Sequence, residues 1–113
     1  MEHYEVRITP FAEKAIQEIG LYIAGNLRSP QTGIRMLSLI RREIEALDTM
    51  PARYPLTSEK PWHDQGIHRM SVKNFFVYYW INEDEKTVQI IHVLYARRDQ
   101  KAQLSKLSDM ISQ

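Results

Sequence analysis

The side chains best suited to chemistry lie in the second half of the chain, at the ends of short runs of β-branched and aromatic residues. Arg69 lies within the first of these runs, Lys73 directly follows it, and Arg97 and Arg98 end the last run. Guanidinium groups bind phosphates and carboxylates in bidentate geometry, so arginines gathered at one place are suited to an anionic or acidic partner. The spacing therefore indicates a cationic rim on a small sheet.

Each of these cations also has a structural interpretation. Arg69 lies inside a strand-like run, where its side chain is either directed at a ligand or paired with a carboxylate. Arg97 and Arg98 either form a two-arginine clamp, or one pairs with an acid while the other is solvated. The sequence leaves both interpretations open.

Two side chains of the last apolar run could transfer protons. His92 has an imidazole, which titrates near neutral pH, and Tyr95 has a phenol that can donate or accept a hydrogen bond. Because both lie in an apolar strand-like run, the alternatives are a hydrogen-bonded structural histidine and a core aromatic residue. Neither residue belongs to a recognisable catalytic motif.

Several classes of chemistry have no sequence support. The chain has no cysteine, which excludes disulfides and thiolate zinc sites, and its 4 histidines are scattered. It has no Gly-rich phosphate loop, HExxH motif or nucleophile elbow. We therefore expect no metal and no cofactor. With no signal-peptide pattern and no apolar run near the roughly 18 residues of a membrane span, we expect a cytoplasmic protein without membrane contact.

The overall charge is nearly balanced, with 15 Lys and Arg against 14 Asp and Glu and a net charge of +1. Attachment to nucleic acid by bulk charge is therefore not expected. Any role in binding anions has to depend on a few cations at defined positions.

The first half of the chain predicts one strand and two helices. Alternation over residues 4–8 indicates a half-buried strand, and Thr9-Pro10 supplies a helix cap and a first-turn proline. Ser29-Pro30 repeats that start signal after a short break. Apolar residues follow each start at helical spacing, so we expect an antiparallel helix hairpin.

The second half predicts three strands, at Ile67–Val72, Phe75–Asn82 and Thr87–Ala96, and a final helix beginning near Asp99. In the middle strand large apolar side chains occupy both faces, which is typical of a central strand. The expected order is βααβββα. This is an α+β fold in a single domain over residues 1–113, with an antiparallel sheet packed on the helix hairpin.

This order, together with two sequence patterns, resembles the RelE/ParE superfamily of type II toxin–antitoxin toxins. The first pattern, R-x-x-x-x-N-[aromatic]-x-x-x-[aromatic], spans Arg69–Tyr79, and the second, V-L-Y-x-R-R-D, spans Val93–Asp99. The resemblance covers nearly the whole chain. It implies a bacterial toxin that causes growth arrest, as in plasmid stabilization, until a cognate antitoxin neutralises it.

The two branches of the superfamily differ in residues that can be compared here. RelE-like members, which cleave mRNA on the ribosome, carry an arginine where this chain has Phe76 and a C-terminal tyrosine where residues 101–104 contain none. ParE-like members, which poison DNA gyrase, end the last strand in a pattern similar to Val93–Asp99. The resemblance therefore favours the ParE branch.

Three hypotheses follow from the resemblance. The leading one is a ParE-like inhibitor of DNA gyrase, silenced by an antitoxin that covers the strands and the cationic rim. The alternative is a ribosome-dependent mRNA endoribonuclease, and the third is a non-toxic member that only binds its antitoxin. The candidate partner-binding residues are Arg69, Lys73, Tyr95, Arg97 and Arg98, and the candidate nuclease residues are Arg69, His92, Tyr95, Arg97 and Arg98.

Overall fold

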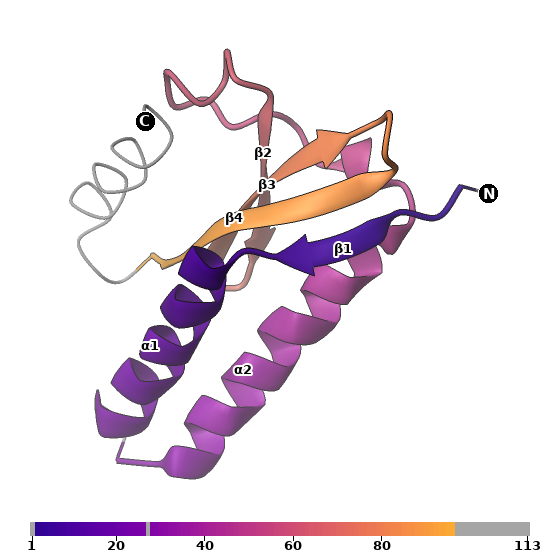
Figure 1. Cartoon of the computed structure of the whole chain (residues 1–113). Coiled ribbons are helices and arrows are strands. Elements are labelled where there is room, and N and C mark those ends of the chain that lie inside the picture. The colour runs from indigo at the N-terminus through magenta and orange to yellow at the C-terminus, as the bar shows by residue number, and fades with distance from the viewer. Residues whose placement is uncertain (1, 27, 97–113) are drawn as a thin grey trace.

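A four-stranded sheet packs on a two-helix hairpin in the computed structural model, which describes residues 2–26 and 28–96 (Figure 1). The strand order is β1-β4-β3-β2, so the predicted α+β class is confirmed. The final helix predicted near Asp99 lies outside the described residues. Within the part that is described, no helix is long and apolar enough to cross a membrane. The elements are β1 Glu5–Ile8, α1 Pro10–Asn26, α2 Pro30–Glu45, β2 Ile67–Val72, β3 Phe75–Asn82 and β4 Thr87–Tyr95.

Both helices begin where the sequence predicted. The Thr9 hydroxyl accepts a hydrogen bond from the backbone N–H of Ala12 at 3.2 Å and donates one to the carbonyl of Ile90 at 2.8 Å. One side chain thus caps α1 and attaches its start to β4. At α2 the Ser29 hydroxyl accepts from the backbone N–H of Thr32 at 3.3 Å, and Pro30 opens the helix.

The first strand departs from the predicted antiparallel arrangement, because β1 pairs with β4 in parallel. Glu5 lies opposite Thr87 and Ile8 lies opposite Ile90, whereas β2, β3 and β4 form the expected antiparallel meander. Parallel neighbours need a long connection between them, and here the connection contains the helix hairpin and the strands β2 and β3. The sheet is therefore mixed.

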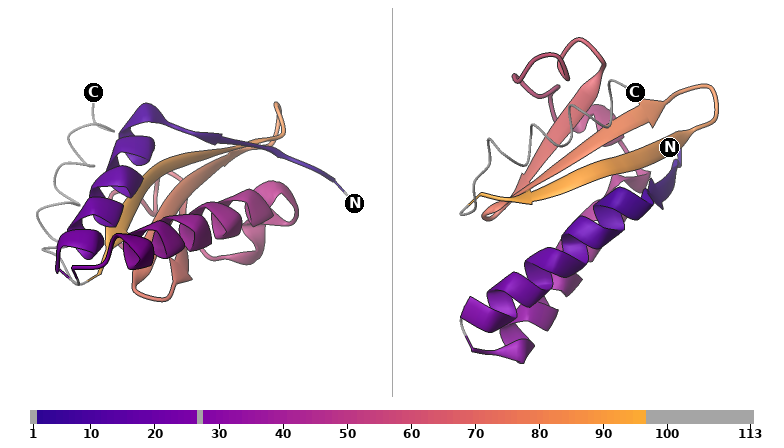
Figure 2. Two further views of the ribbon diagram at one scale, coloured as in Figure 1. Left: turned by 90° about the horizontal axis from the view of Figure 1, so that it is seen from below. Right: turned by 60° about the vertical axis from the view of Figure 1, so that its left-hand side comes forward.

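The main core lies between the helix hairpin and the face of the sheet that we call the inner face (Figure 2). Phe75, Val77 and Tyr79 of β3 belong to this core, while Tyr78 belongs to a second cluster on the outer face. The division of β3 into two apolar faces is therefore confirmed. The buried residues that the helices contribute are Ala12, Ile16, Ile19, Ile23, Ile40 and Ile44.

A bulge in β4 changes the direction of its last side chains. Tyr79 lies opposite Ile90 while Tyr78 lies opposite His92, so Ile91 is an extra residue on β4. As a result Val93 belongs to the inner core and Leu94 to the outer cluster. Strict alternation from Ile90 would have given the opposite assignment.

The two helices approach closely at a pair of glycines, Gly20 in α1 and Gly33 in α2. A Cβ atom added at Gly33 would lie 2.7 Å from the carbonyl oxygen of Gly20 and 3.1 Å from the Cβ of Ala24. Backbone cannot yield as a flexible side chain can, so glycine at this position sets the separation of the helices.

Replacing Gly33 with alanine is therefore expected to lower the free energy of unfolding by about 1–3 kcal/mol, because the helices have to move apart. The direction of this change in stability is informative, since alanine normally stabilises a helix interior relative to glycine by about 1 kcal/mol. Gly25→Ala is the matched control, because a Cβ there meets nothing within 4 Å. Urea denaturation of both variants tests this, and a Gly33→Ala protein as stable as Gly25→Ala would contradict it.

Candidate partner-binding site

The outer face of the sheet brings two of the predicted residues into one row. Arg69 of β2 lies opposite Tyr78 of β3, and Tyr78 lies opposite His92 of β4. A guanidinium, a phenol and an imidazole thus follow one another across three strands. This row is the central part of the candidate site.

Arg69 is held by two contacts. Its guanidinium donates to the carboxylate of Glu59 at 3.2 Å, and its central carbon lies 4.5 Å from the centroid of the Phe76 ring. The side chain is nevertheless 32% exposed, so an anionic group can still reach it. The carboxylate interpretation of Arg69 is thus observed. The contacts orient the cation without burying it.

His92 is almost fully buried, with an exposed fraction of 5%. The centroid of its ring lies 4.8 Å from that of Phe11, near the start of α1. This environment fits the structural interpretation of His92, because a large substrate would have to displace the neighbouring aromatic ring to reach the imidazole.

Tyr95 lies on the other side of the sheet. Its ring stacks on Phe75 at a centroid distance of 5.1 Å and meets Tyr22 of α1 edge-on at 5.8 Å. The bulge at Ile91 places Tyr95 there, one residue beyond the outward-facing Leu94. Arg69 and Tyr95 are therefore not part of one cluster.

The structure describes only part of the predicted cationic rim. Lys73 is exposed in the turn between β2 and β3, at a left-handed φ of 52°. The neighbouring Asn74 accepts a hydrogen bond from the backbone N–H of Ala96 at 2.7 Å. The turn thus lies beside the end of β4. Arg97 and Arg98 follow Ala96 in the sequence but lie outside the described residues.

A cavity of about 350 Å³ with a mixed polar and apolar lining lies beside Arg69, at the edge of β2 away from β3. No strand was predicted for the segment before β2, yet this segment pairs with β2. The N–H of Thr57 donates to the carbonyl of Ile67 at 2.8 Å, and that of Arg69 donates to the carbonyl of Pro55 at 3.1 Å. The lining residues are Tyr54, Pro55, Leu56, Thr57, Ser58, Arg69 and Ser71.

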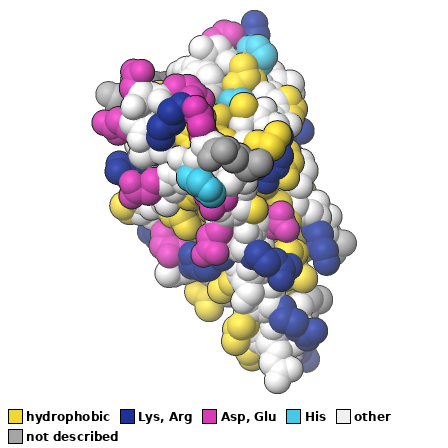
Figure 3. Space-filling model, turned by 90° about the vertical axis from the view of Figure 1, so that its right-hand side faces the viewer, with side chains coloured by type: hydrophobic (Ala, Val, Ile, Leu, Met, Phe, Trp, Pro, Cys, Tyr) yellow, Lys and Arg dark blue, Asp and Glu magenta, His cyan; other side chains and the backbone are white. Residues whose placement is uncertain are grey.

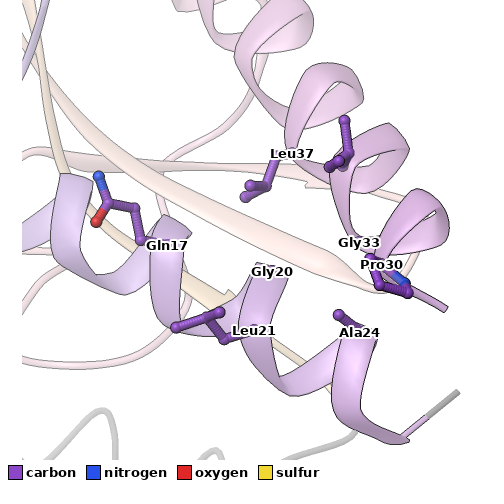
Figure 4. Close-up of a pocket in the computed structure, with 8 residues that line it drawn as sticks. Gln17, Gly20, Leu21, Ala24, Pro30, Gly33 and Leu37 are labelled. Carbon is purple, nitrogen blue, oxygen red and sulfur yellow. The ribbon is translucent and has the colours of Figure 1, made fainter. Parts of the chain in front are cut away.

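An apolar groove of similar volume lies between the helices, near the end of the hairpin far from β1 (Figure 4). Leu21 and Ile34 on its rim are exposed to 74% and 62%. Its lining has no titratable side chain, so the groove can accept apolar groups of a partner but offers no acid–base chemistry. The lining residues are Gln17, Gly20, Leu21, Ala24, Pro30, Gly33, Ile34 and Leu37.

The titratable groups with altered pKa values lie away from the outer-face row. Burial raises the pKa of Tyr79 on the inner face, where its hydroxyl donates to the Pro51 carbonyl at 2.6 Å. At the β3–β4 turn, hydrogen bonds from Lys86 and Tyr4 lower the pKa of Glu83. Residues 2–26 and 28–96 contain no group of acidic or histidine side chains arranged to hold a metal ion.

Comparison with known proteins agrees with this geometry. The family model described as "ParE toxin of type II toxin-antitoxin system, parDE" matches residues 6–100. No match was found among curated protein sequences.

Three solved structures share the fold. The chromosomal ParDE system of Pseudomonas aeruginosa is similar with a TM-score of 0.70 and 15% identity, over 84% of this chain and 98% of that one. The RelBE2 toxin–antitoxin complex of Mycobacterium tuberculosis is similar with a TM-score of 0.63 and 20% identity, over 84% of this chain and 93% of that one. A double arginine mutant of the Escherichia coli toxin RelE in the free state has a TM-score of 0.59 and 11% identity, over 95% of this chain and 92% of that one.

The contact between Arg69 and Glu59 predicts a specific pattern of stabilities. Arg69→Met keeps an aliphatic chain over Phe76 but leaves the carboxylate of Glu59, which is only 24% exposed, without its cation. We expect this variant to lose about 1–2 kcal/mol of unfolding free energy. Adding Glu59→Gln should recover most of that loss. Equal losses in the single and double variants, measured by urea denaturation, would exclude a structural role for the ion pair.

Proposed function

The chain belongs to the ParE toxin family of type II toxin–antitoxin systems, and we propose that it acts by binding and inhibiting DNA gyrase. The observation that supports a binding mechanism is the separation of the candidate proton-transfer groups. Tyr95 packs on the inner face, while His92 is buried against Phe11 on the outer face. A nuclease needs an acid and a base that reach the same phosphodiester.

The cationic residues support the same proposal. Cleavage of a phosphodiester requires cations directed at the developing charge of the transition state. Here Arg69 is partly neutralised by Glu59, and an aromatic ring, Phe76, lies under its guanidinium. Such an oriented and half-exposed arginine is suited to the side chains of a protein partner.

The protein partner that controls the toxin would be a cognate antitoxin. The similar ParDE and RelBE2 structures are toxin–antitoxin systems. We propose that the antitoxin covers the outer face and the rim, with acidic side chains near Arg69, Lys73 and the residues after Ala96. The toxin would act in the cytoplasm, where gyrase works on DNA, and would cause growth arrest when the antitoxin is lost.

One observation favours the ribosome-dependent endoribonuclease as the second candidate. Arg69 and His92 belong to the same row on the outer face, with Tyr78 between them. If the Phe11 ring moved, this row would offer a cation and an imidazole on one surface. The two candidates therefore differ in whether that surface ever opens.

Inhibition of gyrase predicts that, after induction in a bacterium, DNA synthesis falls before protein synthesis, as pulse labelling of both would show. The purified protein should inhibit supercoiling by gyrase and leave mRNA intact on programmed ribosomes. The opposite result in the two purified assays would establish the endoribonuclease instead. A chain that inhibits neither and still binds its antitoxin would be a non-toxic family member.

The ion pair at Arg69 also predicts how antitoxin affinity can be raised. Glu59→Gln removes the competing carboxylate, so Arg69 is free for an acidic partner and affinity should rise by roughly 3- to 10-fold. Glu18→Gln, at an exposed position of α1, makes the same change in net charge as a control. Isothermal titration with the antitoxin compares the two. An equal gain in antitoxin affinity for the two variants would mean that only net charge matters and that Arg69 is not in the interface.

A further inference from the structure

A short segment that precedes β2 lies along part of that strand, at the edge away from β3. We call this segment, residues 54–59, the edge strap. Within residues 2–26 and 28–96, its only strand-like pairing with β2 is the bridge between Leu56 and His68, which is flanked by the backbone hydrogen bonds of residues 55 and 57. The strap therefore takes the place of a further strand, but only over a few residues.

The edge of β2 continues past the strap. The backbone N–H of Arg69 donates to the carbonyl of Pro55, so it points away from β3. Alternate residues of a strand direct their backbone groups to the same side, so those of Ser71 also point away from β3. Ser71 is exposed, and no backbone group of the described chain pairs with it on that side. An extended segment of a partner can therefore pair with a longer stretch of this edge than the strap does.

The strap also occupies the cation of the candidate site. Its last residue, Glu59, accepts the contact from Arg69 at 3.2 Å, which is the contact that an acidic side chain of a partner would make. Figure 3 shows acidic side chains in the upper half of one face, around the sheet, and Lys and Arg side chains along the lower part, where the helix hairpin projects. An acidic partner at the sheet therefore depends on a guanidinium that Glu59 has released.

The contact between the strap and β2 is incompletely satisfied. Thr57 is only 2% exposed, yet its hydroxyl oxygen has no hydrogen-bond partner among the described residues, and the same is true of Oε2 of Glu59. Residues of both the strap and β2 line the cavity of about 350 Å³, and Leu56 in the middle of the strap is 38% exposed. Buried polar atoms without partners and unfilled space both weaken a contact. The strap therefore separates from β2 more easily than β3 does.

Fixed points on either side limit the segment that moves. Nδ1 of His68 lies 2.7 Å from the carbonyl oxygen of Tyr54, at the start of the strap, and Trp62 is buried beyond its end. Between these points, Nδ1 of His63 lies 3.0 Å from the carbonyl oxygen of Thr57. Release of the strap breaks this contact and the bonds to β2, while the rest of the sheet stays in place.

We propose that the edge strap is autoinhibitory, because it occupies β2 and Arg69 until an extended segment of the antitoxin displaces it. The inference rests on the proposed function, since it describes how the antitoxin reaches Arg69. The incoming segment pairs with β2 as far as Ser71 and brings an acidic side chain to the place of the Glu59 carboxylate. Backbone pairing at a sheet edge supplies affinity, and the side chains supply specificity.

A disulfide between the strap and β2 tests the proposal. Leu56 and His68 lie opposite each other without sharing a hydrogen bond, and such pairs have Cα atoms about 4.5 Å apart, within the range of a disulfide. The chain has no cysteine, so Leu56→Cys with His68→Cys forms one defined bridge. The probe is the protein encoded by the reading frame next to the toxin's own, as the candidate antitoxin. It is titrated calorimetrically against the oxidised and the reduced variant.

Oxidation is expected to weaken binding of this protein by at least about 10-fold, because a locked strap leaves almost no chain competent to bind. Reduction should restore the affinity. The control is Ile81→Cys with Val88→Cys, a pair that lies opposite on β3 and β4 and leaves the strap unlocked. Its affinity should not depend on oxidation. Equal affinities of the oxidised and reduced strap variant would overturn the proposal, and so would an equal loss in the control.

Opening of the strap can also be measured in the unaltered protein without a partner. The backbone N–H groups of Thr57 and Arg69 join the strap to β2, whereas β3 lies between two strands. The first two should exchange with solvent at least about 100-fold faster than those of β3, because local opening exposes them. Exchange as slow as in β3 would show that the strap stays closed and would overturn the proposal.

Gyrase inhibition separates this proposal from the proposed function. If the lock prevents binding of the candidate antitoxin but the unaltered protein does not inhibit supercoiling, the strap is supported and the proposed target is wrong. If the unaltered protein and both forms of the variant fail to bind the candidate antitoxin, the strap and the partner site proposed at Arg69 are both overturned.

Discussion

Burial of apolar side chains on both faces of β3 and β4 is the constraint on which the rest of the structure depends. A strand that is apolar on both sides requires cover on both. The helix hairpin covers the inner face, and β1 shields the outer edge of β4. The second cluster, around Trp62, Tyr78 and Leu94, lies on the outer face, where Tyr78 and His92 are buried and Arg69 remains partly exposed.

Short-range patterns in the sequence were sufficient to predict much of the fold. The bounds of β2 and β3 were predicted as they are observed, because alternation and turn residues act over a few positions. The starts of both helices were marked by a hydroxyl residue followed by proline. The parallel pairing of β1 and the attachment of residues 55–57 to β2 were not predicted, since both depend on contacts between distant segments.

The candidate site was predicted less completely for the same reason. Nothing in the sequence connected Arg69 with Glu59 in the preceding loop. The bulge at Ile91 decided the faces of His92 and Tyr95, and a single extra residue in an apolar run has no signature.

The parallel pairing of residues 5–8 with residues 87–90 determines when the sheet can close during synthesis. At the usual rate of translation β1 waits on the order of ten seconds for β4, while the helix hairpin, built from local contacts, can form as it emerges. The outer face is complete only after β4 has joined β3. A chain that ends before residue 87 therefore can form the helix hairpin but lacks the part of the outer face that β4 contributes.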